Sequence, residues 1–483
     1  MGLLLFALRG LLLFALRGLL LLPFAINIRS LAFGGDSVGI LPDGRVAFVP
    51  GGCPGDSVLI DVTKDCKRFV RAAIVDIIDP SPDRVMPACP HFAVCGGCQW
   101  QHVSRQAQLS AKRSIVADAL QRIGKVSNAS EVVGETVTAG NGNGFGYRNK
   151  IELVADTDSG ATAFGFCSAG SGEVVPIQSC LLLPKRLQRA PKAISGVLRY
   201  LSGSGGGLGV CRASLRVAHH TRDVELALWT PPGPFPRAAA SRVLGQALPL
   251  SSLTRVLFRG DLALRDIAKT EVLAGKGLWR EHLGGYSFAV SSPSFFQTNT
   301  LVAERLTQLV LEALDPDGTD TILDLYAGAG TFTLPLAEAG LSVTAVESSG
   351  PAVKDLVRNL ESNGLSAEVI CGDVGREAVR FGHFDLAVVD PPRSGLAEEA
   401  VGALSSVRPR AVAYVSCDPA TLARDVKRLA EEGFALTGVA PVDLFPQTFH
   451  IECVARFERF ERFEGKREAP VKGAMHLTSG KGT

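Results

Sequence analysis

Cys417 stands where a thiol could do chemistry. It closes the apolar run Ala411–Cys417 and precedes Asp418-Pro419, and a helix is predicted from about Ala420. The run predicts a buried parallel strand, and in open α/β sheets ligands bind outside the carboxyl ends of such strands. A thiol at that edge can act as a nucleophile when it is ionised, although an isolated cysteine is more often a small buried apolar side chain.

A carboxylate follows further along the chain. The segment Asp443–Glu452 links two apolar runs that are predicted to pair as an antiparallel hairpin. Glu452 lies early in the second run, so its side chain can face the same crevice as Cys417 and remove a proton there. A lone acid is more often a solvated surface group, and only the pairing with Cys417 favours a catalytic role.

A glycine-rich loop follows the predicted strand Thr321–Tyr326. It has the form Asp-x-Tyr-x-Gly-x-Gly, from Asp324 to Gly330, and it lacks the third glycine of the dinucleotide-binding fingerprint. Glu347 ends the second strand, where an acid can accept hydrogen bonds from both ribose hydroxyls, and Asp373 ends the third. A ligand without a phosphate suits this loop, so we expect S-adenosylmethionine rather than NAD.

The elements around these residues alternate between strand and helix. This rhythm predicts an α/β fold with a doubly wound parallel sheet, and its further strands are expected at Ser342–Glu347, Ala367–Cys371, Phe384–Asp390 and Ala411–Cys417. Asp390-Pro391-Pro392-Arg393 ends the fourth strand. Because a Pro-Pro pair cannot continue a central strand, it predicts a rigid turn with the Asp390 carboxylate facing the crevice. The alternative is a plain strand-to-helix turn.

Three cysteines within ten residues indicate a metal site. Cys89, Cys95 and Cys98 are separated by a segment whose glycines can turn the backbone between ligands. Of three later cysteines that could be the fourth ligand, Cys180 is favoured because it closes a turn-like segment directly before an apolar run; the others are Cys167 and Cys211. Spacing alone does not separate a zinc site from an iron–sulfur cluster.

Two segments combine features that suit nucleic acid. From Asn27 to Asp79, short alternating runs broken by glycine and proline predict a small β-barrel, and its last strands carry a basic cluster, Lys64, Lys67, Arg68 and Arg71. Ahead of a later strand, Tyr147 could stack a base, and Arg148 and Lys150 could pair with phosphates. For both segments the alternative is a solvated, charged strand edge.

The composition describes a folded globular chain of two to four domains. It has 483 residues, 46% hydrophobic and 20% charged, with a formal net charge of +2. Such a charge provides no overall basic field, so contacts with nucleic acid must come from local patches. Eleven cysteines, four of them spaced like metal ligands, fit a reducing cytosol better than a secreted setting.

The first 22 residues repeat LLLFALRG back to back. Arg9 and Arg17 lie inside the apolar run, whereas a signal peptide carries its basic residues ahead of it and a spanning helix excludes them. We interpret the segment as a repeat-derived or wrongly started extension, with a membrane-associating helix as the alternative.

The motifs together resemble the S-adenosylmethionine-dependent RNA (uracil-5-)methyltransferases, in particular the ribosomal-RNA type with an iron–sulfur cluster and an N-terminal TRAM barrel. The resemblance covers roughly Asn27 to Arg456. It is carried by CPHFAVCGGCQWQH, YRNK, SFFQTN, LDLYAGAGTFTL, VVDPPRSG, SCDPATLARD and FPQTFHIE. The resemblance implies a seven-stranded methyltransferase sheet closed by the hairpin, and a cytoplasmic, monomeric enzyme that acts on RNA, large-subunit rRNA before tRNA, without stable membrane association.

The resemblance also assigns residues. It makes Cys417 the nucleophile and Glu452 the base, and it favours a [4Fe–4S] cluster held by Cys89, Cys95, Cys98 and Cys180. It implies S-adenosylmethionine contacts at Gln297, Tyr326, Gly328, Gly330, Thr331, Glu347, Asp373 and Asp390. Two positions depart from the family pattern: Thr331 stands where several relatives have Asn, and Gln447 stands where His is frequent.

The chemistry that this family performs explains the need for these groups. Carbon 5 of uracil is a poor nucleophile until a thiolate adds to carbon 6, and a base must then remove the carbon 5 proton. We expect the N-terminus of the following helix, from Thr421 onward, to help ionise Cys417. The expected domains are a repeat extension over 1–25, the barrel over 26–80, a central α+β domain with the cluster over 84–290, the methyltransferase domain over 291–460 and a disordered tail over 461–483.

Overall fold

The computed structural model describes residues 23–139, 142–156, 163–203, 208–260, 266–378 and 380–460. Residues 1–22 of the predicted extension and the predicted tail lie outside this part of the chain. The chain forms two compact units. The first contains the described residues up to Phe92, together with Cys98–Ile115 and Gln447–Phe449, and the second contains the rest.

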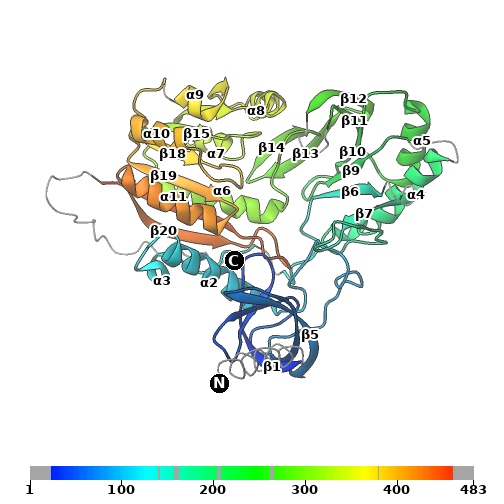
Figure 1. Ribbon diagram of the computed structural model, residues 1–483. Coiled ribbons are helices and arrows are strands. Elements are labelled where there is room, and N and C mark those ends of the chain that lie inside the picture. Colours follow the sequence, from blue (N-terminus) through cyan, green and yellow to red (C-terminus); the bar gives the residue numbers. More distant parts are fainter. Residues whose placement is uncertain are drawn as a thin grey trace, which may run out of the picture. The chain divides into compact units, whose positions relative to one another are not determined.

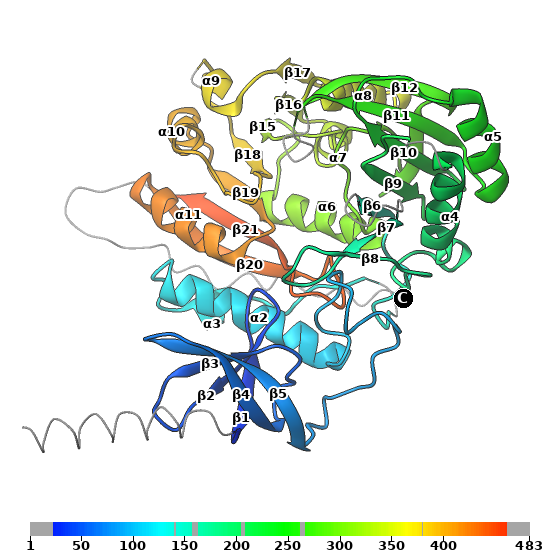
Figure 2. The ribbon, with the colours of Figure 1, turned by 45° about the vertical axis from the view of Figure 1, so that its right-hand side comes forward.

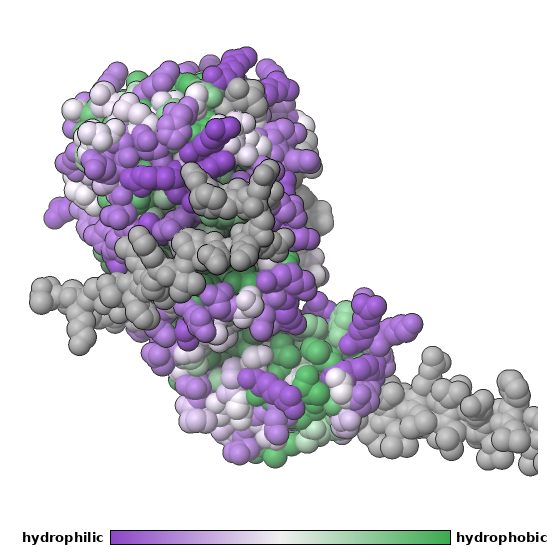
Figure 3. All heavy atoms as spheres, turned by 90° about the vertical axis from the view of Figure 1, so that its left-hand side faces the viewer, coloured by the Kyte–Doolittle hydropathy of each residue, from purple (hydrophilic) through white to green (hydrophobic). Residues whose placement is uncertain are grey.

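The first unit is built on a closed five-stranded barrel in the order β1-β2-β3-β5-β4. Its strands are β1 (Phe24–Leu31), β2 (Ser37–Ile40), β3 (Val46–Val49), β4 (Ser57–Asp65) and β5 (Phe69–Asp79). Alternate side chains such as Ile26, Val58 and Ile60 fill its interior, as the period of two in the sequence requires. The predicted small barrel is therefore confirmed. Figure 3 shows hydrophobic residues gathered over part of the barrel surface.

In the second unit, a mixed sheet in the order β12-β11-β10-β9-β6-β7-β8 precedes the predicted α/β region. Its strands are β6 (Lys150–Asp156), β7 (Ala163–Cys167), β8 (Val174–Val175), β9 (Arg212–Val217), β10 (Val224–Thr230), β11 (Ser252–Phe258) and β12 (Ile267–Gly275). Helices α4 (Ala190–Ser202) and α5 (Arg237–Ala247) lie side by side along this sheet (Figures 1 and 2). A two-stranded hairpin follows, β13 (Leu278–Leu283) and β14 (Tyr286–Ser291).

The remainder of the second unit is a seven-stranded sheet in the order β17-β16-β15-β18-β19-β21-β20. The strands are β15 (Thr321–Leu325), β16 (Ser342–Glu347), β17 (Glu368–Cys371), β18 (Leu386–Val389), β19 (Ala411–Ser416), β20 (Phe434–Val442) and β21 (Glu452–Arg459). The first five run parallel, and β21 pairs antiparallel with both β19 and β20. This is the expected sheet with its closing hairpin.

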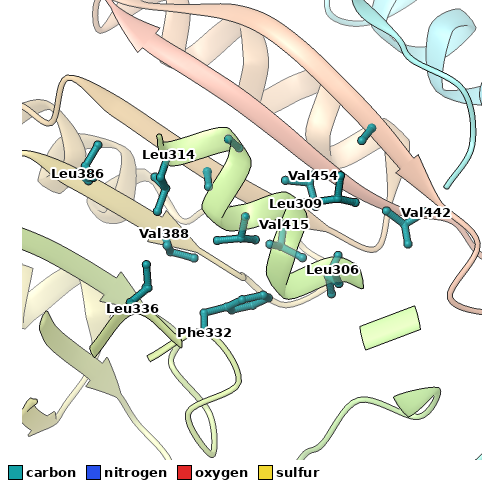
Figure 4. Close-up of a cluster of buried hydrophobic side chains, with 14 of the residues drawn as sticks. Leu306, Leu309, Leu314, Phe332, Leu336, Leu386, Val388, Val415, Val442 and Val454 are labelled. Atoms are coloured by element: carbon teal, nitrogen blue, oxygen red, sulfur yellow. The ribbon is translucent and has the colours of Figure 1, made fainter. Parts of the chain in front are cut away.

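Helices cover both faces of this sheet. On one face α6 (Thr300–Leu314) packs Leu306 and Leu309 against Val415 and Val454 (Figure 4), and α11 (Pro419–Glu431) lies on the other face (Figure 1). The other helices and short turns are α2 (Arg105–Arg122), α3 (Ala129–Val132), η1 (Lys185–Leu187), α7 (Thr333–Glu338), α8 (Gly350–Ser362), α9 (Val374–Ala378) and α10 (Glu398–Val407). Among the helices that the structure describes, none has the length and apolar character needed to cross a bilayer.

Candidate active site

The glycine loop after β15 folds back onto the end of β16. Its backbone takes positive φ angles at Tyr326 (66°), Gly328 (58°) and Gly330 (97°). The Gly328 N–H donates to Oε2 of Glu347 at 2.9 Å. A Cβ at position 330 would lie 2.5 Å from Cδ1 of Leu356. The positive φ angle favours glycine there, and any larger residue would displace the Leu356 side chain.

Three carboxyl groups lie at the carboxyl edge of adjacent parallel strands: Asp324 in β15, Glu347 in β16 and Asp390 after β18. Asp324 is fully buried. Its Oδ2 accepts the Thr333 hydroxyl at 2.6 Å, whereas its Oδ1 has no hydrogen-bond partner among the described residues. Burial and the charge of Glu347 raise the pKa of Asp324 to about 7, and burial with both neighbouring acids raises that of Asp390 to about 7. Such a group of acids attracts a cationic ligand.

The other predicted cofactor residues lie around the same edge. Asp373 is exposed and follows β17, and burial together with the charge of Asp373 raises the pKa of Tyr326 to about 12. Thr331 is buried in the glycine loop. Gln297 is buried ahead of α6, where its carbonyl oxygen accepts the Asn149 side-chain amide at 2.8 Å.

Cys417 and Glu452 come from neighbouring antiparallel strands. The last recorded pair of β19 and β21 joins Ser416 to Cys453, and continuing this register by one residue puts Cys417 opposite Glu452. Burial and the charge of Glu452 raise the pKa of the Cys417 thiol to about 12. Burial and Asp390 likewise raise the pKa of Glu452 well above its usual range. The strand ends therefore bring together the thiol and two acids.

Arg393 acts on the same groups with the opposite sign. Its positive charge lowers the pKa of both Cys417 and Glu452, against the larger effect of burial. It follows Asp390 in the Pro-Pro turn, so this turn delivers both an acid and a cation to the crevice.

The expected activation of Cys417 by the N-terminus of α11 is wrong for this structure. Oδ1 of Asp418 accepts the backbone N–H groups of Ala420 at 2.8 Å and Thr421 at 3.1 Å. An N-cap carboxylate thus satisfies the donors that would have stabilised a thiolate. Its own charge contributes to the rise in the pKa of Cys417.

Asp425 is a site-supporting residue that the sequence analysis missed. It lies in α11 with a fully buried side chain, and its Oδ2 accepts the Leu396 N–H at 2.8 Å. Arg424 pairs with its Oδ1 and donates to the Ser394 carbonyl, and Arg428 pairs with the same oxygen and donates to the Leu396 carbonyl. These bonds tie the turn that carries Asp390 to the helix that follows Cys417. Asp425 is the last residue of the SCDPATLARD motif, and this was its signal in the sequence.

Phe295 was also missed. Its side chain is 63% exposed although Phe296 and Gln297 beside it are buried. An exposed aromatic ring next to a predicted cofactor contact is a candidate for stacking on a base.

The predicted RNA-contacting residues differ in their surroundings. The Tyr147 ring is buried, and its hydroxyl donates to the Pro446 carbonyl at 3.1 Å, so this ring offers no stacking surface in this conformation. Arg148 and Lys150 are partly exposed; Nε of Arg148 donates to the Lys150 carbonyl, and Lys150 pairs with Glu152 at 3.1 Å.

The four predicted cluster cysteines do not form a metal-binding group in the described part of the chain. Within the residues that can be described, no group of three or more His, Cys, Asp or Glu side chains is placed to hold a metal ion. Cys89 and Cys98 belong to the first unit, and Cys95 and Cys180 to the second. The predicted [4Fe–4S] cluster therefore stays a prediction.

Known proteins resemble this chain over nearly its whole length. It is 36% identical, over 445 residues, to a protein of Gloeobacter violaceus named as an uncharacterized RNA methyltransferase, covering 90% of this chain and 96% of that protein. A protein of the same description from Thermosynechococcus vestitus is 32% identical, over 89% of this chain and 96% of its own length.

Family models and a solved structure agree. The model for tRNA (uracil-5-)-methyltransferase matches residues 376–459, and that for the methyltransferase small domain matches residues 291–406. The crystal structure of the Pyrococcus abyssi tRNA (uracil-54, C5)-methyltransferase with S-adenosyl-L-homocysteine is 28% identical, with a TM-score of 0.70, and the match covers 89% of this chain and 99% of that one. The chain therefore belongs to the RNA methyltransferase family and is an S-adenosylmethionine-dependent RNA (uracil-5-)methyltransferase.

Proposed function

We propose that this enzyme forms 5-methyluridine by covalent catalysis, with Cys417 as nucleophile and Glu452 as base. The observation that carries the proposal is the register of β19 and β21, which sets a thiol opposite a buried carboxyl group. A small-molecule methyltransferase would have use for the glycine loop but not for this pair.

The Cys417 thiolate adds to carbon 6 of uracil, and the electron pair of the ring double bond moves to form an enolate. Carbon 5 of the enolate takes the methyl group. S-Adenosylmethionine supplies that methyl group from its sulfonium centre. The Glu452 carboxylate then removes the carbon 5 proton, and breaking the carbon 6–sulfur bond restores both the double bond and the thiolate.

The surroundings suit Glu452 to its step. A carboxylate whose pKa is raised by burial is a stronger base than a solvated one, and it abstracts a proton from carbon more readily. The surroundings of Cys417 work against its step, because burial and nearby acids disfavour the thiolate that must attack carbon 6. Arg393 is the residue that offsets this effect.

The target base must leave its stack to reach the crevice. We assign Phe295 the role of stacking on the extruded uracil or on its neighbour, because its ring is exposed beside Gln297. Arg148 and Lys150 remain proposed phosphate contacts. Asp390 is proposed to hold the uracil imide edge or to orient the thiol.

The RNA substrate has two candidates. Large-subunit rRNA is our first proposal, and it rests on the resemblance of the barrel and of the cysteine spacing to one type of the family. tRNA is the second, favoured by the name of the matched family model and by the solved tRNA methyltransferase. Methylation of separate rRNA and tRNA transcripts, with the product nucleoside located by mass spectrometry, decides between them.

Covalent trapping tests the mechanism. 5-Fluorouridine carries fluorine on carbon 5, where uridine carries the proton that the base removes. Because the fluorine cannot be removed by a base, a nucleophile that has added to carbon 6 stays attached after methylation. We expect an adduct on a denaturing gel with the wild type and with Cys453→Ala, a matched change of a neighbouring thiol, and none with Cys417→Ala. An adduct that survives Cys417→Ala would refute the assignment.

The [4Fe–4S] cluster is kept as a separate proposal. It rests on the spacing of Cys89, Cys95 and Cys98 and on the family resemblance, which favours this cluster over zinc. Anaerobic purification followed by iron, sulfide and zinc analysis tests it. About four irons per chain lost in Cys95→Ser would support it, and stoichiometric zinc or no metal would reject it.

A further inference from the structure

Positive charge is strongly segregated in this chain. Residues 174–250 contain ten Lys or Arg and two Asp or Glu, a net charge of +8, whereas the whole chain has a formal net charge of +2. The remainder of the chain therefore has a net charge of −6. A local excess of this size on one segment indicates an anionic partner.

The two acids of this segment are buried and already paired. Asp223 pairs with Arg280 at 2.9 Å, and Glu225 pairs with Arg216 at 3.4 Å. Neither acid lies at the surface, so neither offsets the exposed cations of the segment.

Most exposed cations of the segment have no ionic partner. The structure records no ion pair or side-chain hydrogen bond, among the residues it describes, for six exposed side chains: Lys185, Arg189, Lys192, Arg199, Arg222 and Arg242. Other helices pair arginines with acids of the same helix, as Arg358 does with Asp355 in α8 and Arg428 with Asp425 in α11. Helices α4 and α5 contain no acid with which to do so.

The cations of α4 lie on one face. Lys192, Gly196 and Arg199 follow the i, i+4, i+7 spacing of a helix stripe, opposite the buried Ile194 and Leu198. A Cβ at position 196 would meet no atom within 4 Å. Gly196 therefore leaves open space on the helix surface between Lys192 and Arg199, and a phosphate backbone can approach closely there.

An aromatic ring stands at the end of this stripe. Tyr200 is 74% exposed and directly follows Arg199. Exposed cations contact phosphates and an exposed ring stacks on a base, so the two together suit single-stranded nucleic acid.

We propose that the face formed by η1, α4 and α5 binds the phosphate backbone of the substrate RNA outside the target uridine, with Tyr200 stacking on an unpaired base. The anionic partner is taken to be RNA because the enzyme is an RNA methyltransferase. The proposal rests on that activity but not on the roles of Cys417 and Glu452. It adds a second contact region, on the α4–α5 side of the central sheet.

Charge reversal tests the proposal. The variant K192E/R199E is compared with K354E/K427E, which changes the net charge equally at exposed lysines of α8 and α11. The probes are full-length tRNA and large-subunit rRNA transcripts and a short hairpin containing the target loop, with binding measured by fluorescence anisotropy over a range of salt concentrations. K192Q/R199Q is a milder form, and thermal melting confirms that each variant is folded.

For K192E/R199E we expect about tenfold weaker binding of the bound transcript and a salt slope shallower by about 1 to 2, because each lost phosphate contact removes about 0.7 to 0.9 from the slope. Binding of the short hairpin, and kcat at saturating RNA, should not change. Y200A should weaken binding of the transcript, and Y200F should restore it because stacking needs only the ring.

Three results would overturn the proposal. The first is a loss of RNA affinity in K354E/K427E equal to that in K192E/R199E, and the second is an unchanged salt slope in K192E/R199E. The third is wild-type RNA binding by K192E/R199E together with lost binding to anionic phospholipid vesicles or to polyglutamate. The last would assign the face to a lipid or protein partner. Failure of the catalytic proposal is distinguishable, because it shows as a missing 5-fluorouridine adduct in the wild type while the salt slopes are still measured.

Discussion

The Asp425 carboxylate accepts the hydroxyl hydrogen of Tyr414 at 2.9 Å, in the interior behind the strand end that leads to Cys417. Tyr414 belongs to β19 and Asp425 to α11, so the bond joins the two elements that flank the nucleophile. The same carboxylate holds the turn after Asp390 through Leu396. One buried acid thus fixes three segments of the proposed active site.

Asp425→Ala should lower the free energy of unfolding by about 3 to 5 kcal/mol, because it leaves a buried hydroxyl and a backbone N–H without their acceptor and two arginines without their anionic partner. We also expect slower adduct formation on 5-fluorouridine RNA at temperatures where the variant is folded, because the turn that carries Asp390 and Arg393 is released. Urea denaturation and single-turnover kinetics measure the two effects.

Tyr414→Phe is the control for Asp425. It removes one hydrogen bond and should cost about 1 kcal/mol while the rate of adduct formation stays near that of the wild type. Equal rates in Tyr414→Phe and Asp425→Ala would show that Asp425 stabilises the fold without positioning the turn.

Local signals were enough to predict the methyltransferase sheet. The β-branched runs and the glycine loop identified the strands around Asp324 and Cys417, because each signal depends on neighbouring residues alone. Glu452 was expected to face the same crevice as Cys417, but the pairing of β21 with β19 that sets their register was not predicted.

Long-range partners could not be predicted in the same way. Gln447 was noted only as a departure from the family pattern. In the first unit its backbone N–H donates to Oε1 of Gln108 at 3.1 Å, and Nε2 of Gln108 donates back to its Oε1 at 3.0 Å. No property of either segment by itself specifies this reciprocal pair. Asp425 is a similar case, because an acid in an amphipathic helix looks solvent-exposed until the fold buries it.

Glu452→Gln should halt the reaction after methyl transfer. Without a base the carbon 5 proton stays on the ring, so Cys417 cannot be eliminated and ordinary uridine RNA should become covalently attached. We expect a radiolabelled methyl group in an enzyme–RNA band on a denaturing gel, and turnover reduced by about 100-fold to 10,000-fold. Glu458→Gln, further along β21, should behave as the wild type. Release of methylated RNA by Glu452→Gln at the normal rate would assign the base elsewhere.

The reactivity of Cys417 should depend steeply on pH. Because burial and nearby acids raise the pKa of its thiol to about 12, the ionised fraction rises about tenfold per pH unit below that value. Alkylation of Cys417 by iodoacetamide, followed by peptide mass spectrometry, should show this slope between about pH 7 and 9. Arg393→Ala should slow it further by removing the opposing positive charge, and Arg393→Lys should preserve it. A rate that is flat with pH would mean that the thiol is already ionised in the free enzyme.

Asp324 should make the stability of the ligand-free enzyme fall as pH rises. Its pKa is raised from 3.8 to about 7 by burial, so the folded state holds the proton more tightly than the unfolded state does. The stabilising contribution is complete below about pH 4 and is lost as pH rises to about 7, at up to about 1.4 kcal/mol per pH unit.

Asp324→Asn should flatten this dependence in urea denaturation series, because the amide cannot ionise. Asp385 provides a control of opposite sign: hydrogen bonds from the backbone and side chain of Thr321 lower its pKa, so its contribution is present above about pH 4 and lost on acidification. Asp385→Asn should therefore destabilise the enzyme at neutral pH and leave the fall between pH 4 and 7 in place.

Cationic S-adenosylmethionine should bind the wild type more tightly as pH rises through the same range, since deprotonation of Asp324 and Asp390 creates the charge that attracts it. Calorimetry at several pH values measures this, and an affinity that falls with rising pH would show that these carboxyl groups bind the cofactor in their protonated form.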